Sequence, residues 1–174
     1  MKVEKGERSV RRALLGVVLC SIGFAVGGPA YAQTDDAFLR SAMEAGNFEI
    51  QLGLLAESKA GSEHVKLLGH LIADDHIQSG AFLRQVANIE GVKTSMDTGA
   101  HSKQLDQLSS LQGAEFDKAF LQTVTDMHKA EIAAFLEEAH NGKDLALKQF
   151  ALTDLPTLQK HLSIADQLQS QSKM

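Results

Sequence analysis

The spacing of the apolar residues is the feature that most constrains the fold of this chain. Along four long segments an apolar residue recurs every three or four positions, which is the period of an α-helix with one buried face. The predicted helices span residues 35–60, 63–90, 114–141 and 144–169. The residues predicted to face the core are Phe38, Ala42, Ala45, Phe48, Leu52, Leu55, Val65, Leu68, Ile72, Phe82, Val86, Ile89, Phe116, Phe120, Val124, Ile132, Phe135, Leu147, Phe150, Leu158, Leu162, Ala165 and Leu168. Four amphipathic helices in one chain predict an all-α bundle.

The connections between these segments predict their order in space. Gly61 and Gly142 mark tight turns, so each turn joins two antiparallel helices. Residues 91–101 are predicted to form a loop and residues 103–111 a short helix, which together make a long crossover between the second and third helices. This pattern predicts an antiparallel, ferritin-like four-helix bundle, with both tight turns at one end. Pro156 predicts a kink in the fourth helix.

The first 32 residues have the three regions of a secretory signal peptide. Basic residues precede an apolar stretch over residues 13–26, and Ala30-Tyr31-Ala32 has the small-residue pattern of a cleavage site. The apolar stretch is shorter than the roughly 20 residues that a helix needs to span a bilayer. We therefore predict cleavage after Ala32 and a mature periplasmic domain of residues 33–174. The export route, general secretory or twin-arginine through Arg11 and Arg12, stays open.

The composition of the mature domain excludes several classes of function. The signal peptide would take five of the 17 Lys and Arg residues and two of the 22 Asp and Glu residues, which leaves a net charge of −8. Nucleic-acid binding needs clustered basic residues, so none is predicted. Cys20, the one cysteine, would be removed, which excludes thiolate chemistry in the mature domain. No phosphate-binding glycine loop or nucleophile motif is present, and no catalytic residue is assigned.

Polar residues interrupt the predicted apolar faces, where a core would otherwise be apolar. They are Glu49 in the first helix, Asp75 and His76 in the second, His128 in the third, and Asp154 and His161 in the fourth. An α-helix rises about 1.5 Å per residue. Counted from the two tight turns, most of these groups lie about 18–22 Å along the bundle, and His161 lies about one helical turn deeper. The sequence therefore predicts one polar layer in the middle of the bundle.

Three imidazoles and two or three carboxylates in one layer are suitable ligands for iron, manganese, zinc or copper. The alternative is that they form structural pairs, His76 with Asp126 or His128 with Asp75, that bind nothing. Known di-iron bundles use Glu-x-x-His on two helices, and this spacing is missing from the predicted layer. It occurs once, at residues 137–140, where the last turn of the third helix predicts a surface position. His64, His70 and His101 are predicted to be solvated.

Five groups of residues form a combination of motifs: Glu49 and Glu57, Ile72-Ala73-Asp74-Asp75-His76, Phe116-Asp117, Val124-Thr125-Asp126-Met127-His128 and Leu155-Pro156-Thr157-Leu158-Gln159-Lys160-His161-Leu162. Together they resemble the motifs of a bacterial family of exported, ferritin-like four-helix proteins of unknown function, often labelled outer-membrane proteins. The resemblance covers residues 36–168. It implies the bundle fold and marks four of the candidate residues, Glu49, His76, His128 and His161. It implies no activity, and the sequence gives no support to the outer-membrane label.

We expect a periplasmic bundle that binds a transition metal in its core for storage, buffering or protection under envelope stress. The main alternative is a structural or interaction module whose buried polar groups only pair with one another. A redox or hydrolytic metalloenzyme is a third and weaker interpretation. No transmembrane segment is expected in the mature form, protein partners are not indicated by the sequence, and homo-oligomer formation stays open.

Overall fold

A computed structural model describes residues 35–172, and this part of the chain is all-α, with no β-strand. The predicted signal peptide and its cleavage site lie outside the described residues. Four long helices make up most of the structure: α1 (Asp35–Lys59), α2 (Glu63–Glu90), α4 (Gly113–Asn141) and α5 (Leu145–Gln171). The crossover contains a 3₁₀ turn, η1 (Gly99–His101), and a short helix, α3 (Ser102–Ser109). The bounds of the long helices agree with the predicted ones to within two residues.

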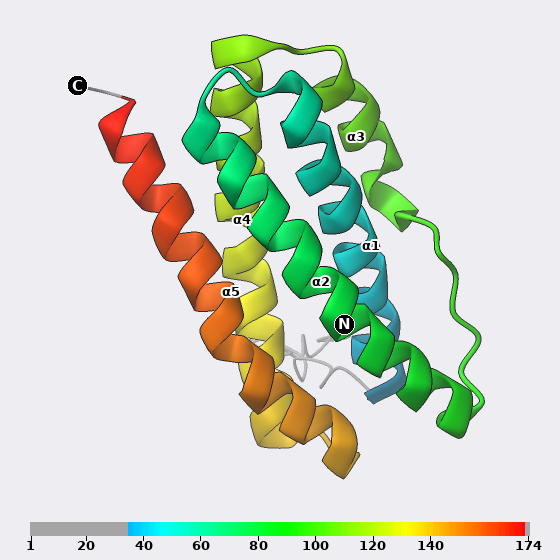
Figure 1. Cartoon of the computed structure of the whole chain (residues 1–174). Coiled ribbons are helices and arrows are strands. Elements are labelled where there is room, and N and C mark those ends of the chain that lie inside the picture. Colours follow the sequence, from blue (N-terminus) through cyan, green and yellow to red (C-terminus); the bar gives the residue numbers. More distant parts are fainter. Residues whose placement is uncertain (1–34, 173–174) are drawn as a thin grey trace, which may run out of the picture. The chain divides into compact units, whose positions relative to one another are not determined.

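The long helices pack as two antiparallel pairs, α1 with α2 and α4 with α5 (Figure 1). The pairs meet through α1 against α4 and α2 against α5. The crossover returns along the side of α1, where α3 packs. Within residues 35–172 no helix is long and apolar enough to cross a membrane.

The core consists of two apolar clusters. One contains Phe38, Leu83, Phe135, Phe150 and Leu158, and the other contains Phe48, Ile72, Phe116, Phe120 and Val124 among their buried members. Along α4, His128 lies between the cluster that holds Val124 and the cluster that holds Phe135. The polar layer predicted from the sequence therefore divides the apolar core near its middle.

The prediction that both tight turns lie at one end of the bundle is wrong. The amides of Gly61 and Ser62 donate hydrogen bonds of 3.0 and 2.9 Å to Asp117 near the start of α4. The amide of Asp144 donates one of 2.8 Å to Asp35, the first residue of α1. Since α1 begins beside one turn and ends at the other, the turns lie at opposite ends (Figure 1).

The predicted polar layer does not depend on which ends the turns occupy. Because α4 has 29 residues, it is about 43 Å long. A side chain about 21 Å from one end of such a helix is therefore about as far from the other. The error in the topology leaves the depth of the layer nearly unchanged.

The buried face of α2 also differs from the predicted one at two positions. Ile89 is 74% exposed, and Phe82 is 40% exposed and stacks on Phe150 with ring centroids 5.3 Å apart. Leu83 and Ala87 are buried instead, and Val86 is buried as predicted, because His76, Leu83 and Val86 continue the face that contains Ile72. Pro156 does not interrupt α5, which is helical from Leu145 to Gln171.

Candidate metal centre

The polar layer receives side chains from all four long helices. Glu49 comes from α1, His76 from α2, His128 and Glu131 from α4, and His161 from α5. The residues Glu49, His128 and His161 have no exposed surface, and His76 is 6% exposed. Groups of this kind are strongly hydrated in water, so their burial needs compensation by other polar groups or by a cation.

Four of these residues direct donor atoms to one small region. His76 Nε2 lies 2.9 Å from Glu49 Oε2, and His128 Nδ1 lies 3.1 Å from Glu49 Oε1. Glu131 Oε2 lies 4.0 Å from the same nitrogen of His128. One donor atom from each of the four residues lies within 4.8 Å of all the others. His76, His128 and His161 form a second group by the same measure.

Several of these atoms are close to one another without forming hydrogen bonds. Both carboxylate oxygens of Glu49, Nε2 of His76 and Oε2 of Glu131 are buried and have no partner in hydrogen-bond geometry. Buried polar atoms of this kind are rare in folded proteins, and each calls for a physical explanation. A cation placed between these converging atoms would satisfy them, and an ion pair between Glu49 and a protonated His76, 2.9 Å apart, is the alternative.

His161 is held in a chain of hydrogen bonds beside this group. Its Nδ1 lies 3.0 Å from His128 Nε2, and its Nε2 lies 3.0 Å from Asp75 Oδ2. Nδ1 of His128 also lies 3.0 Å from the carbonyl oxygen of Val124. The Asp75 carboxylate favours a proton on Nε2 of His161, because a carboxylate can only accept. His128 and His161 are therefore coupled to a residue that is partly exposed, Asp75.

The two glutamates of the layer, Glu49 and Glu131, have pKa values that are shifted in opposite directions. Burial raises the pKa of Glu49, but His76 and His128 outweigh this effect and lower it to about 2. Burial and the neighbouring Glu49 raise the pKa of Glu131 well above its usual value. Glu49 is therefore the charged carboxylate of the pair, and Glu131 favours its neutral form.

The three histidines of the layer also differ from one another in pKa. Burial lowers the pKa of His76, but the Glu49 carboxylate outweighs burial and raises it. Burial lowers the pKa of His128 despite Glu49, and burial together with His128 lowers the pKa of His161 to about 4. His128 and His161 consequently favour the neutral form, in which an imidazole can bind a metal.

The structure brings Glu49, His76, His128 and His161 together and gives Asp75 and Asp154 other contacts. Asp75 contacts His161, and Asp154 accepts a hydrogen bond of 3.0 Å from Ser79. Neither belongs to the two groups of converging donors. The alternative pairs, His76 with Asp126 and His128 with Asp75, are not formed; Asp126 is exposed and bonded to Gln122.

His161 lies in the same layer as His128, although it was expected about one turn deeper. Side chains of an α-helix lean toward the helix N-terminus. Since α4 and α5 are antiparallel, His128 and His161 lean toward each other, and the offset of about one turn is closed.

Glu131 was missed by the sequence analysis. It lies three residues after His128, so the two share one face of α4. The signal in the sequence is His-x-x-Glu, the reverse of the Glu-x-x-His order of the known di-iron bundles. The Glu and His of the Glu-x-x-His motif at residues 137–140 are exposed, as predicted, whereas Glu138 between them is buried, at 2% exposure, because it packs against the turn at Gly142.

The family profile described as "Domain of unknown function (DUF4142)" matches residues 25–168. The match covers most of the chain and the whole polar layer. This protein belongs to the DUF4142 family. The matched range begins seven residues before the predicted cleavage site at Ala32.

Among solved structures, the DUF4142 chain is similar to a DUF305 protein from Streptomyces coelicolor that is described as a proposed secreted protein. The TM-score is 0.67, the identity is 13%, and the match covers 80% of this chain and 93% of that chain. At this identity the likeness shows a shared fold alone. No curated protein sequence matches the chain.

Proposed function

We propose that this DUF4142 protein is an exported, ferritin-like bundle that binds a transition-metal ion through Glu49, His76, His128 and Glu131. The observation that carries the proposal is the convergence of four buried donors from three helices, several of them without hydrogen-bond partners. Its role would be metal storage, buffering or protection under stress in the periplasm.

The donor set suits a divalent ion. Two imidazole nitrogens and two carboxylate oxygens are ligands that iron, manganese, zinc and copper accept. The two carboxylates together carry the charge that neutralises M²⁺, which lowers the electrostatic penalty of placing the ion in an apolar core. Of the four ligands, Glu131 would change its protonation state most on metal binding, because a cation beside its carboxyl group favours the ionised form.

Asp75 and His161 would orient one of the ligands. A proton on His161 Nε2 directed at Asp75 leaves Nδ1 of His161 as an acceptor for the Nε2–H of His128. Nδ1 of His128, which lies 3.0 Å from the Val124 carbonyl oxygen and 3.1 Å from Glu49, would lose its proton when it binds the metal, and this chain of hydrogen bonds would hold the remaining proton on Nε2. Partners of this kind fix the tautomer and orientation of ligating histidines in other metal proteins.

Export is supported by the N-terminal sequence and by the description of the structural relative. Residues 1–32 have the pattern of a cleaved signal peptide. The similar DUF305 protein is itself described as proposed to be secreted. Mass spectrometry of the protein recovered from the periplasm tests this part, and a mature N-terminus at Gln33 is expected.

Metal analysis of protein purified from the periplasm without a histidine tag tests the proposed site. About one tightly bound transition-metal ion per chain is expected, either as isolated or after reconstitution. The His76→Ala/His128→Ala double variant should lose it. The His64→Ala/His70→Ala variant is the matched control, because both residues are exposed on the same helix. A wild-type protein that holds no metal even after reconstitution contradicts the proposal.

A structural role for the polar layer is the second candidate, and one observation favours it. Both ring nitrogens of His161 have hydrogen-bond partners in the structure, as expected for a histidine that only stabilises the core. In that case the His76→Ala/His128→Ala variant loses stability, and the wild type binds no metal.

A further inference from the structure

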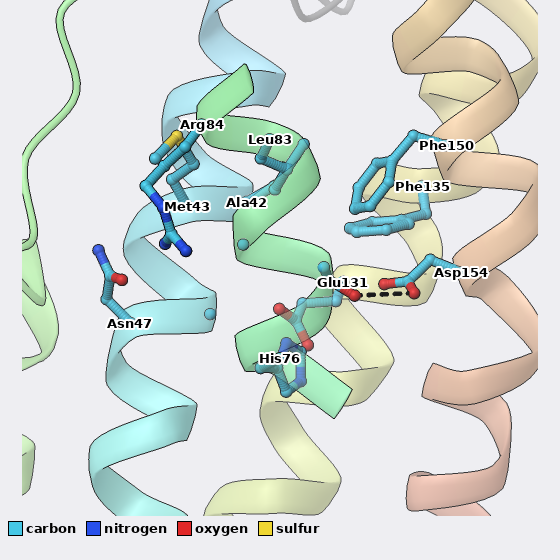
Figure 2. Close-up of a pocket in the computed structure, with 13 residues that line it drawn as sticks. Ala42, Met43, Asn47, His76, Leu83, Arg84, Glu131, Phe135, Phe150 and Asp154 are labelled. Atoms are coloured by element: carbon cyan, nitrogen blue, oxygen red, sulfur yellow. Dashed lines mark hydrogen bonds between the residues drawn. The ribbon is translucent and has the colours of Figure 1, made fainter. Parts of the chain in front are cut away.

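A small cavity adjoins the proposed metal site on one side. Its volume is about 10 Å³, which is room for about one water molecule. His76 and Glu131 form part of its wall, whereas Glu49 and His128 do not. Figure 2 shows His76, Glu131 and Asp154 gathered at one end of the cavity, away from Arg84 and Met43. A molecule in the cavity would therefore approach a bound metal from the side of His76 and Glu131.

The wall of the cavity offers a fixed hydrogen-bond acceptor. Asp154 is half-buried, and its Oδ1 accepts a hydrogen bond of 3.0 Å from the Ser79 hydroxyl, which fixes the orientation of the carboxylate. Both residues line the cavity. A carboxylate held in this way can accept a hydrogen bond from water or hydroxide.

Gly46 keeps the space beside His76 open. It is buried within α1 and lines the cavity. A Cβ atom at this position would lie 3.6 Å from His76 Nδ1 and would meet no other atom within 4 Å. The fold could therefore accept alanine here, and the glycine leaves free a volume close to that of a methyl group.

We infer that this cavity is a binding position for one exchangeable, water-sized ligand of the metal, oriented by the Asp154 carboxylate. The inference rests on the proposed metal site and extends it. The ion would have four protein ligands and one open position, which a water molecule fills. Metal sites that keep such a position can act on small molecules, whereas purely structural sites are closed. The ligand class is water, hydroxide or another molecule of similar size.

The test uses the full protein loaded with Mn²⁺ or Cu²⁺, which are paramagnetic, in water enriched in ¹⁷O. Electron–nuclear double resonance should detect one strongly coupled, exchangeable oxygen in the wild type. Gly46→Ala should bind the ion with unchanged stoichiometry and lose the coupled oxygen. A wild type that holds the ion without this coupling, or a Gly46→Ala variant that retains it, overturns the inference and leaves the metal site standing. A protein that binds neither ion contradicts the metal site itself.

The role of Asp154 is tested by the residence time of the bound water. Asp154→Ala should shorten it by about tenfold, because a hydrogen bond to a charged group contributes about a factor of ten or more. Asp154→Asn keeps an acceptor and should restore most of the residence time. Equal residence times in the wild type and Asp154→Ala would show that Asp154 does not orient the ligand.

Discussion

Asp75 is the residue that links the buried histidines to the surface of the bundle. Its carboxylate lies 3.0 Å from His161 Nε2. Direct partners of ligating histidines typically contribute 10- to 100-fold to metal affinity, and Asp75 acts on the ligand His128 through His161, so we expect Asp75→Ala to weaken metal binding by about tenfold, the lower end of that range. Competition with a chelator of known affinity measures the change. Asp74→Ala is the matched control, because Asp74 is exposed and contacts only the surface residue His70 among the histidines. Equal losses in the two variants would contradict a specific role for Asp75.

The raised pKa of the buried Glu138 carboxyl leads to a separate prediction about how the stability of the fold depends on pH. Burial, with Asp35 and Asp144 nearby, raises its pKa from 4.5 to about 7. Between these values the folded protein binds more protons than the unfolded chain, so this group lowers the free energy of unfolding as the pH rises. We expect Glu138→Gln to remove this loss and to be more stable than the wild type at pH 8, by about 1–3 kcal/mol.

Urea unfolding at pH 5 and at pH 8 measures the effect of Glu138. The difference between the variant and the wild type should be small at pH 5 and larger at pH 8. Glu137→Gln, at the exposed neighbouring position, should change stability little at either pH. A difference for Glu138→Gln that does not grow with pH would show that the buried carboxylate is not destabilising.

The sequence predicted the members of the polar layer better than their contacts. Glu49, His76, His128 and His161 stand at positions of the apolar face, so the helical period alone predicts that they are buried. Their partners depend on the relative height and rotation of neighbouring helices, which the period does not contain. Glu131 was missed because it lies at the edge of the face, and only the spacing from His128 could have indicated it.

At the scale of the helices, the caps and turns explain why the bounds were predictable. Asp144 accepts a hydrogen bond of 2.8 Å from the Leu147 amide at the start of α5, and Gly91 ends α2 in the left-handed conformation. These are local signals, which the sequence carries directly. The rotation of α2 at its second half was less predictable, because Phe82 and Leu83 are both large and apolar.

The contact between α1 and α2 depends on glycine. A Cβ at Gly69 would lie 2.6 Å from the Cβ of Ala56 and 2.9 Å from the carbonyl oxygen of Gly53. We expect Gly69→Ala to force the helices apart and to lower the free energy of unfolding by about 1–3 kcal/mol.

Gly80→Ala is the matched control on the same helix. A Cβ there would meet only the flexible end of Arg84, at 3.2 Å. Alanine is the better helix former, so this variant should be unchanged or stabilised by up to about 1 kcal/mol. Denaturant unfolding compares the two. Similar effects of the two substitutions would show that the helices do not depend on close contact at Gly69.

At the scale of the whole molecule, each helical pair holds the turn of the other. Asp117 of α4 accepts from the amides of Gly61 and Ser62, and Asp35 of α1 accepts from the amides of Lys143 and Asp144. These contacts lie at opposite ends of the bundle, so they fix the two pairs against each other. The sequence could not indicate them, because they join residues 55 and more positions apart.

We therefore expect Asp117→Ala to lower the free energy of unfolding by about 1–2 kcal/mol, the usual effect of removing a side-chain cap. Asp126→Ala is the control on the same helix, since Asp126 is exposed and bonds only to Gln122 in its own helix. Thermal unfolding measures both variants. An Asp117→Ala protein as stable as the Asp126→Ala protein would contradict the proposed coupling of the two pairs.

A bound metal would stabilise the whole bundle, because its proposed ligands come from α1, α2 and α4. A ligand present at 100 times its Kd raises the free energy of unfolding by about 2.7 kcal/mol when it binds only the folded state. For a domain of this size that corresponds to a rise in Tm of about 10 °C. Calorimetry with added metal and with a chelator measures this rise.

Glu131→Gln separates ligation from any general effect of the ion. Because the pKa of Glu131 is raised well above its usual value, the metal-free protein favours the neutral carboxyl, which glutamine resembles in shape and charge. The metal-free variant should therefore unfold at nearly the same temperature as the metal-free wild type. When metal is added, the Glu131→Gln variant should show little of the rise in Tm that the wild type shows, because glutamine cannot supply the second negative charge that neutralises the ion. A variant that shows the full rise would remove Glu131 from the ligand set, and a variant that unfolds much earlier without metal would show that Glu131 is ionised in the metal-free core.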